Sequence, residues 1–249
     1  MKGLKRLALL PTVLLLAIVL ISACLPATPT STPIPPSGQA PLATQSVKEN
    51  DFNEGQISLD RNFYVVIDGS GSMESAQYAG GFSQRIDAAK WAAEEFIIKS
   101  VSPDVNLGLY VFDEGGDRER VPLGKNNRLE IVAVIDTIRA DGGTPLNSAI
   151  KTGVKALVKQ RNLQLGYGEF YVVVVTDGEA TDGQMGKSVS YANENGIPII
   201  TIGFGLKSDH PLKKDSLSYR NATSPEELRK ALEETQSESD YYDASTFQK

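Results

Sequence analysis

Short apolar runs rich in β-branched residues alternate along this chain with stretches whose apolar residues recur at helical spacing. Phe63–Asp68 ends in a Gly/Ser turn, and Tyr171–Val175 is a continuous run of the kind expected of a strand covered on both faces. Further strands are predicted at 105–112, 118–123 and 198–204, and helices around 86–97, 129–138, 146–158, 187–195 and 225–232. The polar run 118–123 is expected at a sheet edge. This alternation predicts an α/β fold, a parallel sheet with helices on both faces.

Three predicted loops carry hydroxyl and carboxylate side chains toward one edge of this sheet. Asp68, Ser70 and Ser72 follow the first strand. Thr144 precedes a helix as a candidate N-cap, and Asp177 follows the long apolar strand. Each has an ordinary explanation as a turn or cap residue, but binding sites in such sheets lie at the carboxyl ends of the strands. Since hard divalent cations prefer oxygen ligands, the loops together predict a metal site.

The pattern Asp-x-Ser-x-Ser, followed by a distant Thr and a distant Asp, resembles the metal-ion-dependent adhesion site of von Willebrand factor A domains. The resemblance extends from residue 63 to about residue 235. It implies a Rossmann-like, doubly wound, mostly parallel sheet with one antiparallel edge strand. It also implies that Ser70 and Ser72 bind the cation directly. Asp68 and Asp177 would act largely through bound waters, and Thr144 would ligate directly in one state of the site.

Mg²⁺ is the ion that this resemblance and the ligand chemistry favour, and Mn²⁺ could substitute for it. Neutral hydroxyls leave most of the ion's charge uncompensated, so the expected partner is a protein whose Asp or Glu completes the coordination. Further acidic residues fall in loops at the same edge, namely Asp113, Glu114, Asp141, Glu179 and Asp182. The simplest interpretation is a solvated acidic rim. The alternative is a ligand rim that attracts basic residues flanking the partner's carboxylate.

The composition excludes several other kinds of site. A single cysteine, Cys24, and a single histidine, His210, exclude an intrachain disulfide framework and a zinc site built from sulfur and imidazole. His210 lies in a polar, lysine-rich stretch and is expected at the surface rather than as a general base. The chain has 31 acidic against 25 basic residues and a sequence pI of about 5.0, so no nucleic-acid partner is expected.

The N-terminus has the pattern of an export signal. Lys2, Lys5 and Arg6 precede the apolar run Leu7–Ala23. The run ends in Ile-Ser-Ala-Cys, which resembles the lipobox of bacterial lipoproteins and implies that Cys24 is acylated and anchors the chain to a membrane. A retained membrane-spanning anchor is the alternative. Removal of the signal would leave 22 basic against 31 acidic residues, a net charge of −9.

Composition also divides the chain into four predicted parts. Residues 1–23 form the signal peptide, and 24–58 form a Pro/Thr/Ser-rich linker that is expected to act as an extended spacer. Residues 59–236 form the folded domain, and 237–249 form an acidic, flexible tail. The expected location is extracytoplasmic, at a cell membrane or cell surface.

These observations together predict a lipid-anchored binding domain rather than an enzyme. A solute-binding lipoprotein component of a transporter is the alternative, disfavoured because one domain of this size has no second lobe to close over a solute. A metal-dependent hydrolase is disfavoured further, because no general base is positioned near the predicted site.

Overall fold

The computed structural model describes residues 58–238 of the chain. The predicted signal peptide, Cys24 and nearly all of the predicted linker therefore lie outside the described residues, as does the tail from residue 239. Among the helices that are described, none has the length and apolar character needed to cross a membrane.

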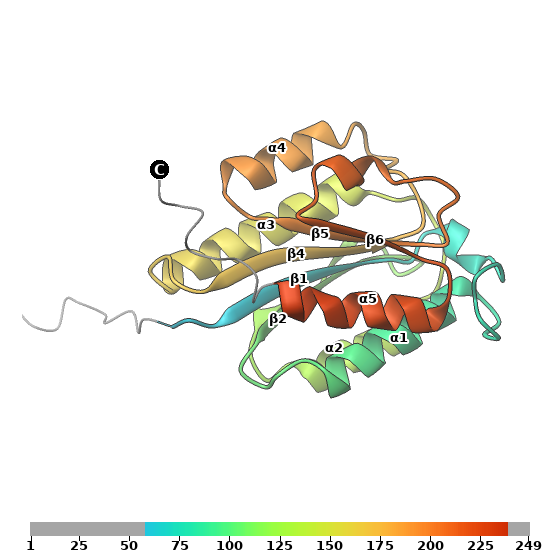
Figure 1. The fold of residues 1–249 in the computed structure, drawn as a ribbon, viewed down its shortest axis with the longest axis horizontal. Coiled ribbons are helices and arrows are strands. Elements are labelled where there is room, and N and C mark those ends of the chain that lie inside the picture. The colour runs from blue at the N-terminus through green and yellow to red at the C-terminus, as the bar shows by residue number, and fades with distance from the viewer. Residues whose placement is uncertain (1–57, 239–249) are drawn as a thin grey trace, which may run out of the picture. The chain divides into compact units, whose positions relative to one another are not determined.

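A six-stranded sheet runs through the middle of the domain in the order β3-β2-β1-β4-β5-β6 (Figure 1). The strands are β1 (Arg61–Asp68), β2 (Asn106–Phe112), β3 (Arg118–Gly124), β4 (Glu169–Thr176), β5 (Ile199–Phe204) and β6 (Ser218–Ala222). Neighbouring strands pair in parallel, except that β3 pairs antiparallel with β2 at one edge. The predicted fold class is thereby confirmed.

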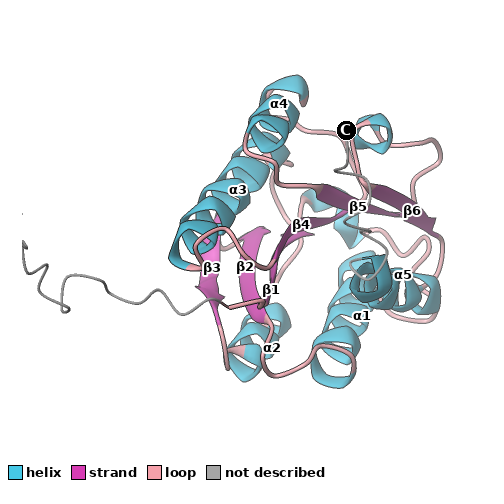
Figure 2. Cartoon of the chain, turned by 60° about the vertical axis from the view of Figure 1, so that its left-hand side comes forward, coloured by secondary structure: helices cyan, strands magenta, loops and turns pink. Residues whose placement is uncertain are grey.

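Helices cover both faces of this sheet, as Figures 1 and 2 show. One face carries α1 (Arg85–Lys99), α2 (Arg128–Asp136) and α5 (Pro225–Glu238), and the other carries α3 (Leu146–Leu163) and α4 (Gly186–Glu194). Two short 3₁₀ helices, η1 (Gly71–Glu74) and η2 (Pro211–Lys214), lie in the connections.

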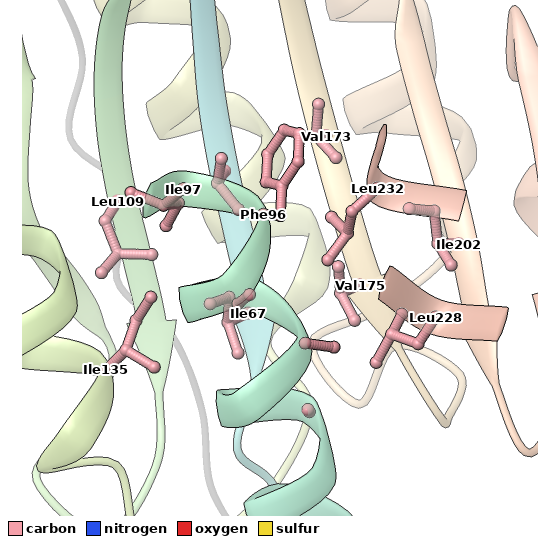
Figure 3. Close-up of a cluster of buried hydrophobic side chains, with 14 of the residues drawn as sticks. Ile67, Phe96, Ile97, Leu109, Ile135, Val173, Val175, Ile202, Leu228 and Leu232 are labelled. Carbon is pink, nitrogen blue, oxygen red and sulfur yellow. The ribbon is translucent and has the colours of Figure 1, made fainter. Parts of the chain in front are cut away.

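The central strands are buried on both sides, so their side chains alternate between two cores. In β1, Val65 and Ile67 face α1 and α5, whereas Tyr64 and Val66 face α3. Figure 3 shows the first core, in which Phe96 of α1 lies among side chains of β1, β4 and α5. Each fully buried aliphatic or aromatic side chain contributes about 1.5–3 kcal/mol relative to leaving it exposed.

Strand β6 was not predicted. Its sequence, Ser-Tyr-Arg-Asn-Ala, has neither the apolar run nor the alternation that marked the other strands. It forms because its backbone pairs with β5, from Ile200–Ser218 to Phe204–Ala222, at the exposed edge of the sheet. The pairing depends on tertiary contacts rather than on local propensity.

The topology brings the ends of β1 and β4 together. These strands are direct neighbours in register, with Ile67 opposite Val175. The chain leaves β1 toward α1 on one face of the sheet and leaves β4 toward α4 on the other (Figure 2). The crevice at such a switch point is where ligands bind in open α/β sheets.

Candidate metal centre

The loop after β1 is held against the loop that precedes α3 by backbone hydrogen bonds. Gly71 N donates to Gly142 O at 3.1 Å, and Asp141 N donates to Gly69 O at 2.9 Å. A Cβ atom placed on Gly69 would lie only 2.9 Å from the Cβ of Asp113, so a residue with a side chain would push the loop away. Glycine at this position therefore lets the β1 loop lie close to the end of β2.

Four of the five predicted ligands are joined by one continuous chain of hydrogen bonds. Asp68 is the fully buried last residue of β1. Its Oδ1 accepts from Ser70 N at 2.8 Å, and its Oδ2 accepts from the Thr176 hydroxyl at 2.5 Å. The Ser70 and Ser72 Oγ atoms are 3.0 Å apart, and the Ser72 hydroxyl donates to Asp177 Oδ1 at 2.6 Å.

Thr144 approaches the same place from the third loop. A Cβ atom placed on Gly178 would lie 3.8 Å from Thr144 Oγ1 and 4.0 Å from Ser72 Oγ, so both hydroxyls face this glycine. The Thr144 backbone is fixed by Thr181, whose hydroxyl accepts from Thr144 N and whose N–H donates to Thr144 O, each at 2.9 Å. Within residues 58–238 the Thr144 hydroxyl itself makes no hydrogen bond, which leaves it available to a ligand.

The prediction that Thr144 caps the following helix is wrong. The first N–H groups of α3 are instead capped by Asp182, which accepts from Asn147 N at 3.0 Å and from Ser148 N at 2.8 Å. Burial alone would raise the pKa of Asp182, but the hydrogen bonds from Ser148 and Asn147 outweigh it and lower that pKa. The Asp182 carboxylate therefore serves the helix, not a ligand.

The predicted acidic rim is smaller than expected. Asp113 is buried, pairs with Arg120 and accepts from Gly115 N at 2.8 Å, so its carboxylate is not available to a partner. The predicted rim residues that remain exposed without serving a helix are Glu114, Asp141 and Glu179.

A buried arginine also contributes to the site. Arg85, in the first turn of α1, forms an ion pair with Asp177 Oδ2, and the two side chains are 8% and 0% exposed. Asp68 has no such cation, and its pKa rises to about 6, first because it is buried and then because Asp177 is negative. Hydrogen bonds from Ser70 and Thr176 act in the opposite direction. The site therefore holds two buried carboxylates, Asp68 and Asp177, but a single buried cation, which pairs with Asp177.

The donor chemistry at this place fits a hard divalent cation. Nowhere in the described part of the chain do three His, Cys, Asp or Glu side chains form a group that could hold a metal. Beside the two carboxylates, hydroxyl oxygens are the further side-chain ligands that this place offers. Two carboxylates and three hydroxyls from three loops suit Mg²⁺, which takes oxygen ligands and retains water molecules.

His210 is buried, contrary to the prediction of a surface position. Its Nδ1 accepts from Leu212 N at 3.1 Å, and its Nε2 lies 2.9 Å from Gly178 O, so Nε2 carries the proton in this neutral tautomer. Burial lowers the pKa of His210, against the opposing effects of the Gly178 carbonyl and the Glu179 charge. The side chain therefore supports the loop that follows Asp177.

Comparison with known proteins gives matches in sequence and in fold. The sequence profile of the von Willebrand factor type A domain matches residues 62–248. A 4-hydroxy-3-methylbut-2-en-1-yl diphosphate synthase (flavodoxin) of Pseudomonas putida is 30% identical over 144 residues, which are 55% of this chain and 36% of that enzyme. The chain spans less than two fifths of the length of the curated relatives that it matches.

Solved structures share the fold. The conserved hypothetical protein BatB from Bacteroides thetaiotaomicron superposes with a TM-score of 0.57 at 17% identity, covering 72% of this chain and 98% of that one. The pilus adhesin SpaC from Lactobacillus rhamnosus GG gives a TM-score of 0.55 at 16% identity, covering 74% of this chain and 31% of that one. The profile match covers most of the chain and the whole sheet, and this protein belongs to the von Willebrand factor type A domain family.

Proposed function

We propose that this domain binds a protein partner through a Mg²⁺ ion held by Asp68, Ser70, Ser72, Thr144 and Asp177, and that an Asp or Glu of the partner completes the coordination. The observation that carries the proposal is the convergence of these five side chains at the switch point of the sheet, with the Ser72 and Thr144 hydroxyls both facing Gly178. The Thr144 hydroxyl, which makes no hydrogen bond within residues 58–238, supports the proposal further because it is available as a ligand.

The ion would attract the partner's carboxylate, and the side chains of this chain would hold the ion in place. Ser70 and Ser72 are held by the contacts of the β1 loop, so their hydroxyls need little rearrangement to act as ligands. Exposed Glu114, Asp141 and Glu179 surround this edge and favour a partner whose carboxylate has basic neighbours. Mn²⁺ has similar ligand preferences and would replace Mg²⁺ in experiments.

A two-step experiment tests this function. Mn²⁺ binding to the full chain in detergent is measured by electron paramagnetic resonance, with Ser70→Ala as the variant that should lose it. A lysine-flanked glutamate peptide is then added with Mg²⁺ or with chelator, and its glutamine counterpart serves as the matched control. Binding of the glutamate peptide only, and only with Mg²⁺, is expected. Equal binding of both peptides, or binding that survives chelation, would contradict the proposal.

We infer in addition that Cys24, which lies outside the described residues, carries a lipid that anchors the domain on the extracytoplasmic side of a membrane. The inference rests on the signal-like segment and the Ile-Ser-Ala-Cys sequence. Cys24→Ser should move the protein from the membrane fraction to the soluble fraction once the signal is cleaved. Retention in the membrane fraction would indicate a retained anchor instead.

The binding proposal is preferred over the two alternatives drawn from the sequence. Residues 58–238 form one sheet with helices on both faces and no second α/β lobe that could enclose a solute. An enzymatic role would need a base at the site. The one buried histidine nearby, His210, has both ring nitrogens engaged by the backbone.

A further inference from the structure

Arg85 occupies a position that helix stability alone does not explain. It is the first residue of α1, where the helix dipole favours negative rather than positive side chains. Its guanidinium is nevertheless buried there and paired with Asp177. An arginine cannot lose its charge in a protein, so this position stays cationic under all working conditions. Asp177 compensates the charge.

The chain before α1 folds around the Arg85 side chain. Arg85 Nε donates to Gln77 O at 3.2 Å, and the guanidinium carbon lies 5.6 Å from the centre of the Tyr78 ring. The backbone N–H of Arg85 donates to Ser75 O at 2.7 Å. Tyr78 has a φ of 67°, a left-handed conformation that a bulky residue seldom adopts. The segment 75–84 is therefore arranged around a guanidinium that points into the metal site.

We propose that Arg85 is the internal counter-ion of Asp177 and competes with the metal for this carboxylate, so that it sets how tightly the cation binds. This inference rests on the proposed function, since it concerns the same site. Both oxygens of Asp177 are already engaged, Oδ1 by the Ser72 hydroxyl and Oδ2 by Arg85. A divalent ion held by Ser72 and Asp177 would have to share this carboxylate with the guanidinium, and the two positive charges would repel each other in a region shielded from water.

Metal binding therefore weakens the Arg85–Asp177 pair and loosens the segment that folds around it. The chain contains a single tryptophan, Trp91 of α1, which reports on this segment. The ring centres of Trp91 and Phe82 are 5.9 Å apart, and Phe82 belongs to the segment 75–84. A change in the position of the segment changes the surroundings of the Trp91 indole, and thus its fluorescence.

The test compares metal affinity in the full chain and in Arg85→Gln. Mn²⁺ binding is followed by electron paramagnetic resonance and Mg²⁺ binding by calorimetry. Arg85→Gln keeps a hydrogen-bonding side chain but removes the competing charge, so it should bind both ions roughly tenfold or more tightly, the scale of a coupling between two sites. Thermal unfolding in chelator shows whether the variant is folded before metal is added.

Two further variants separate charge from other effects. Arg85→Lys keeps the charge and should bind the ions within about threefold of the natural chain, and it carries the test if Arg85→Gln does not fold without metal. Arg61→Gln removes a charge from the Arg61–Glu169 ion pair at the start of β1, roughly 23 Å along the strand from Asp68. It should leave metal affinity unchanged.

The outcomes distinguish this inference from the function on which it rests. Tighter binding in Arg85→Gln, together with a metal-dependent change in Trp91 fluorescence in the natural chain, supports it. Unchanged or weaker binding in Arg85→Gln, equal tightening in Arg85→Lys, or constant Trp91 fluorescence overturns the inference while the metal site itself stands. No ion binding by any of these chains overturns the proposed function.

Discussion

At the scale of single residues, Asp68 shows how burial of a carboxylate beside a second carboxylate lowers the stability of the fold. Its carboxylate is fully buried beside Asp177, and its pKa is raised from 3.8 to about 6. The folded chain therefore binds a proton more readily than the unfolded chain between these pH values, so stability falls as the pH rises through this range. Above pH 6 the charged Asp68 therefore destabilises the fold.

Asp68→Asn should accordingly separate stability from metal binding. In chelator at pH 7.5 the free energy of unfolding should rise by about 1–2 kcal/mol, because a buried charge is removed while one oxygen still accepts a hydrogen bond. Urea unfolding measures this change, and the same variant should lose Mg²⁺ binding. Asp113→Asn is the matched control. It breaks the buried pair with Arg120 and should lower stability by about 3 kcal/mol. A similar loss of stability in both variants would show that the buried charge of Asp68 does not destabilise the fold.

His210 should lower the stability of the fold at acidic pH. The unfolded chain binds a proton near pH 6.5, whereas burial lowers the pKa of the folded residue, so stability falls as the pH drops below about 6.5. Protonation also places a hydrogen on Nδ1, which now accepts from Leu212 N. His210→Gln should remove this contribution. Asp68 acts in the opposite sense over a similar pH range, so the measurement is the difference between the two unfolding profiles. A difference that is independent of pH would contradict the assignment.

Arg85 and His210 also mark the limit of sequence reasoning at this scale. The prediction of five ligands rests on a local pattern and on strand ends for Asp68, Ser70, Ser72 and Asp177, and on a position before a predicted helix for Thr144. The Arg85–Asp177 pair joins residues 92 positions apart, and nothing in the sequence around either residue reveals it. His210 stands among polar residues, yet the fold of its loop buries the ring against Gly178. Such contacts depend on tertiary structure.

At the scale of elements, hydrophobic patterning predicted the central strands and all five α-helices of residues 58–238 but missed β6. Strands β1, β4 and β5 are covered on both faces, so burial requires apolar residues throughout and leaves a clear sequence signal. β6 is an edge strand with mostly polar, partly exposed residues. It is held by backbone pairing with β5, which does not require apolar side chains, so its sequence does not show that it is a strand.

The packing of α3 against the sheet gives a prediction at this scale. The Tyr64 ring of β1 is fully buried between Gly153 of α3 and Gly108 of β2, and a Cβ atom on either glycine would lie 2.6 Å from the ring. Alanine normally stabilises a helix interior by about 1 kcal/mol relative to glycine. Gly153→Ala should instead lower the free energy of unfolding by about 1–2 kcal/mol, because the added methyl group overpacks the core.

Gly186→Ala is the matched control for this packing. Gly186 is also helical, at the start of α4, but a Cβ atom there would meet no atom within 4 Å. The variant should be neutral or slightly stabilising in urea unfolding. If Gly153→Ala behaves in the same way, the contact between α3 and Tyr64 is looser than the structure shows.

At the scale of the whole molecule, the order of the strands explains why one site gathers residues from distant parts of the chain. β1 and β4 are neighbours although about 100 residues separate them, and α3 precedes β4 on the opposite face from α1. Alternation in the sequence predicted a parallel sheet, but alternation alone does not fix the strand order. The resemblance to a family implied a doubly wound, mostly parallel sheet with one antiparallel edge strand, which the structure confirms, but the order of the strands comes from the structure itself.

Metal binding should therefore stabilise the whole domain, because the site joins three loops from different parts of the sheet. An ion that binds only the folded chain adds about 2.7 kcal/mol of stability at a concentration one hundredfold above its dissociation constant, which raises the Tm of a domain of this size by roughly 5–10 °C. Differential scanning calorimetry of the full chain in detergent, with Mg²⁺ or with chelator, measures the shift. Sodium chloride at equal ionic strength controls for screening, and Ser70→Ala should abolish the Mg²⁺-dependent part. A Tm that responds equally to both salts would show that the three loops hold no specific cation.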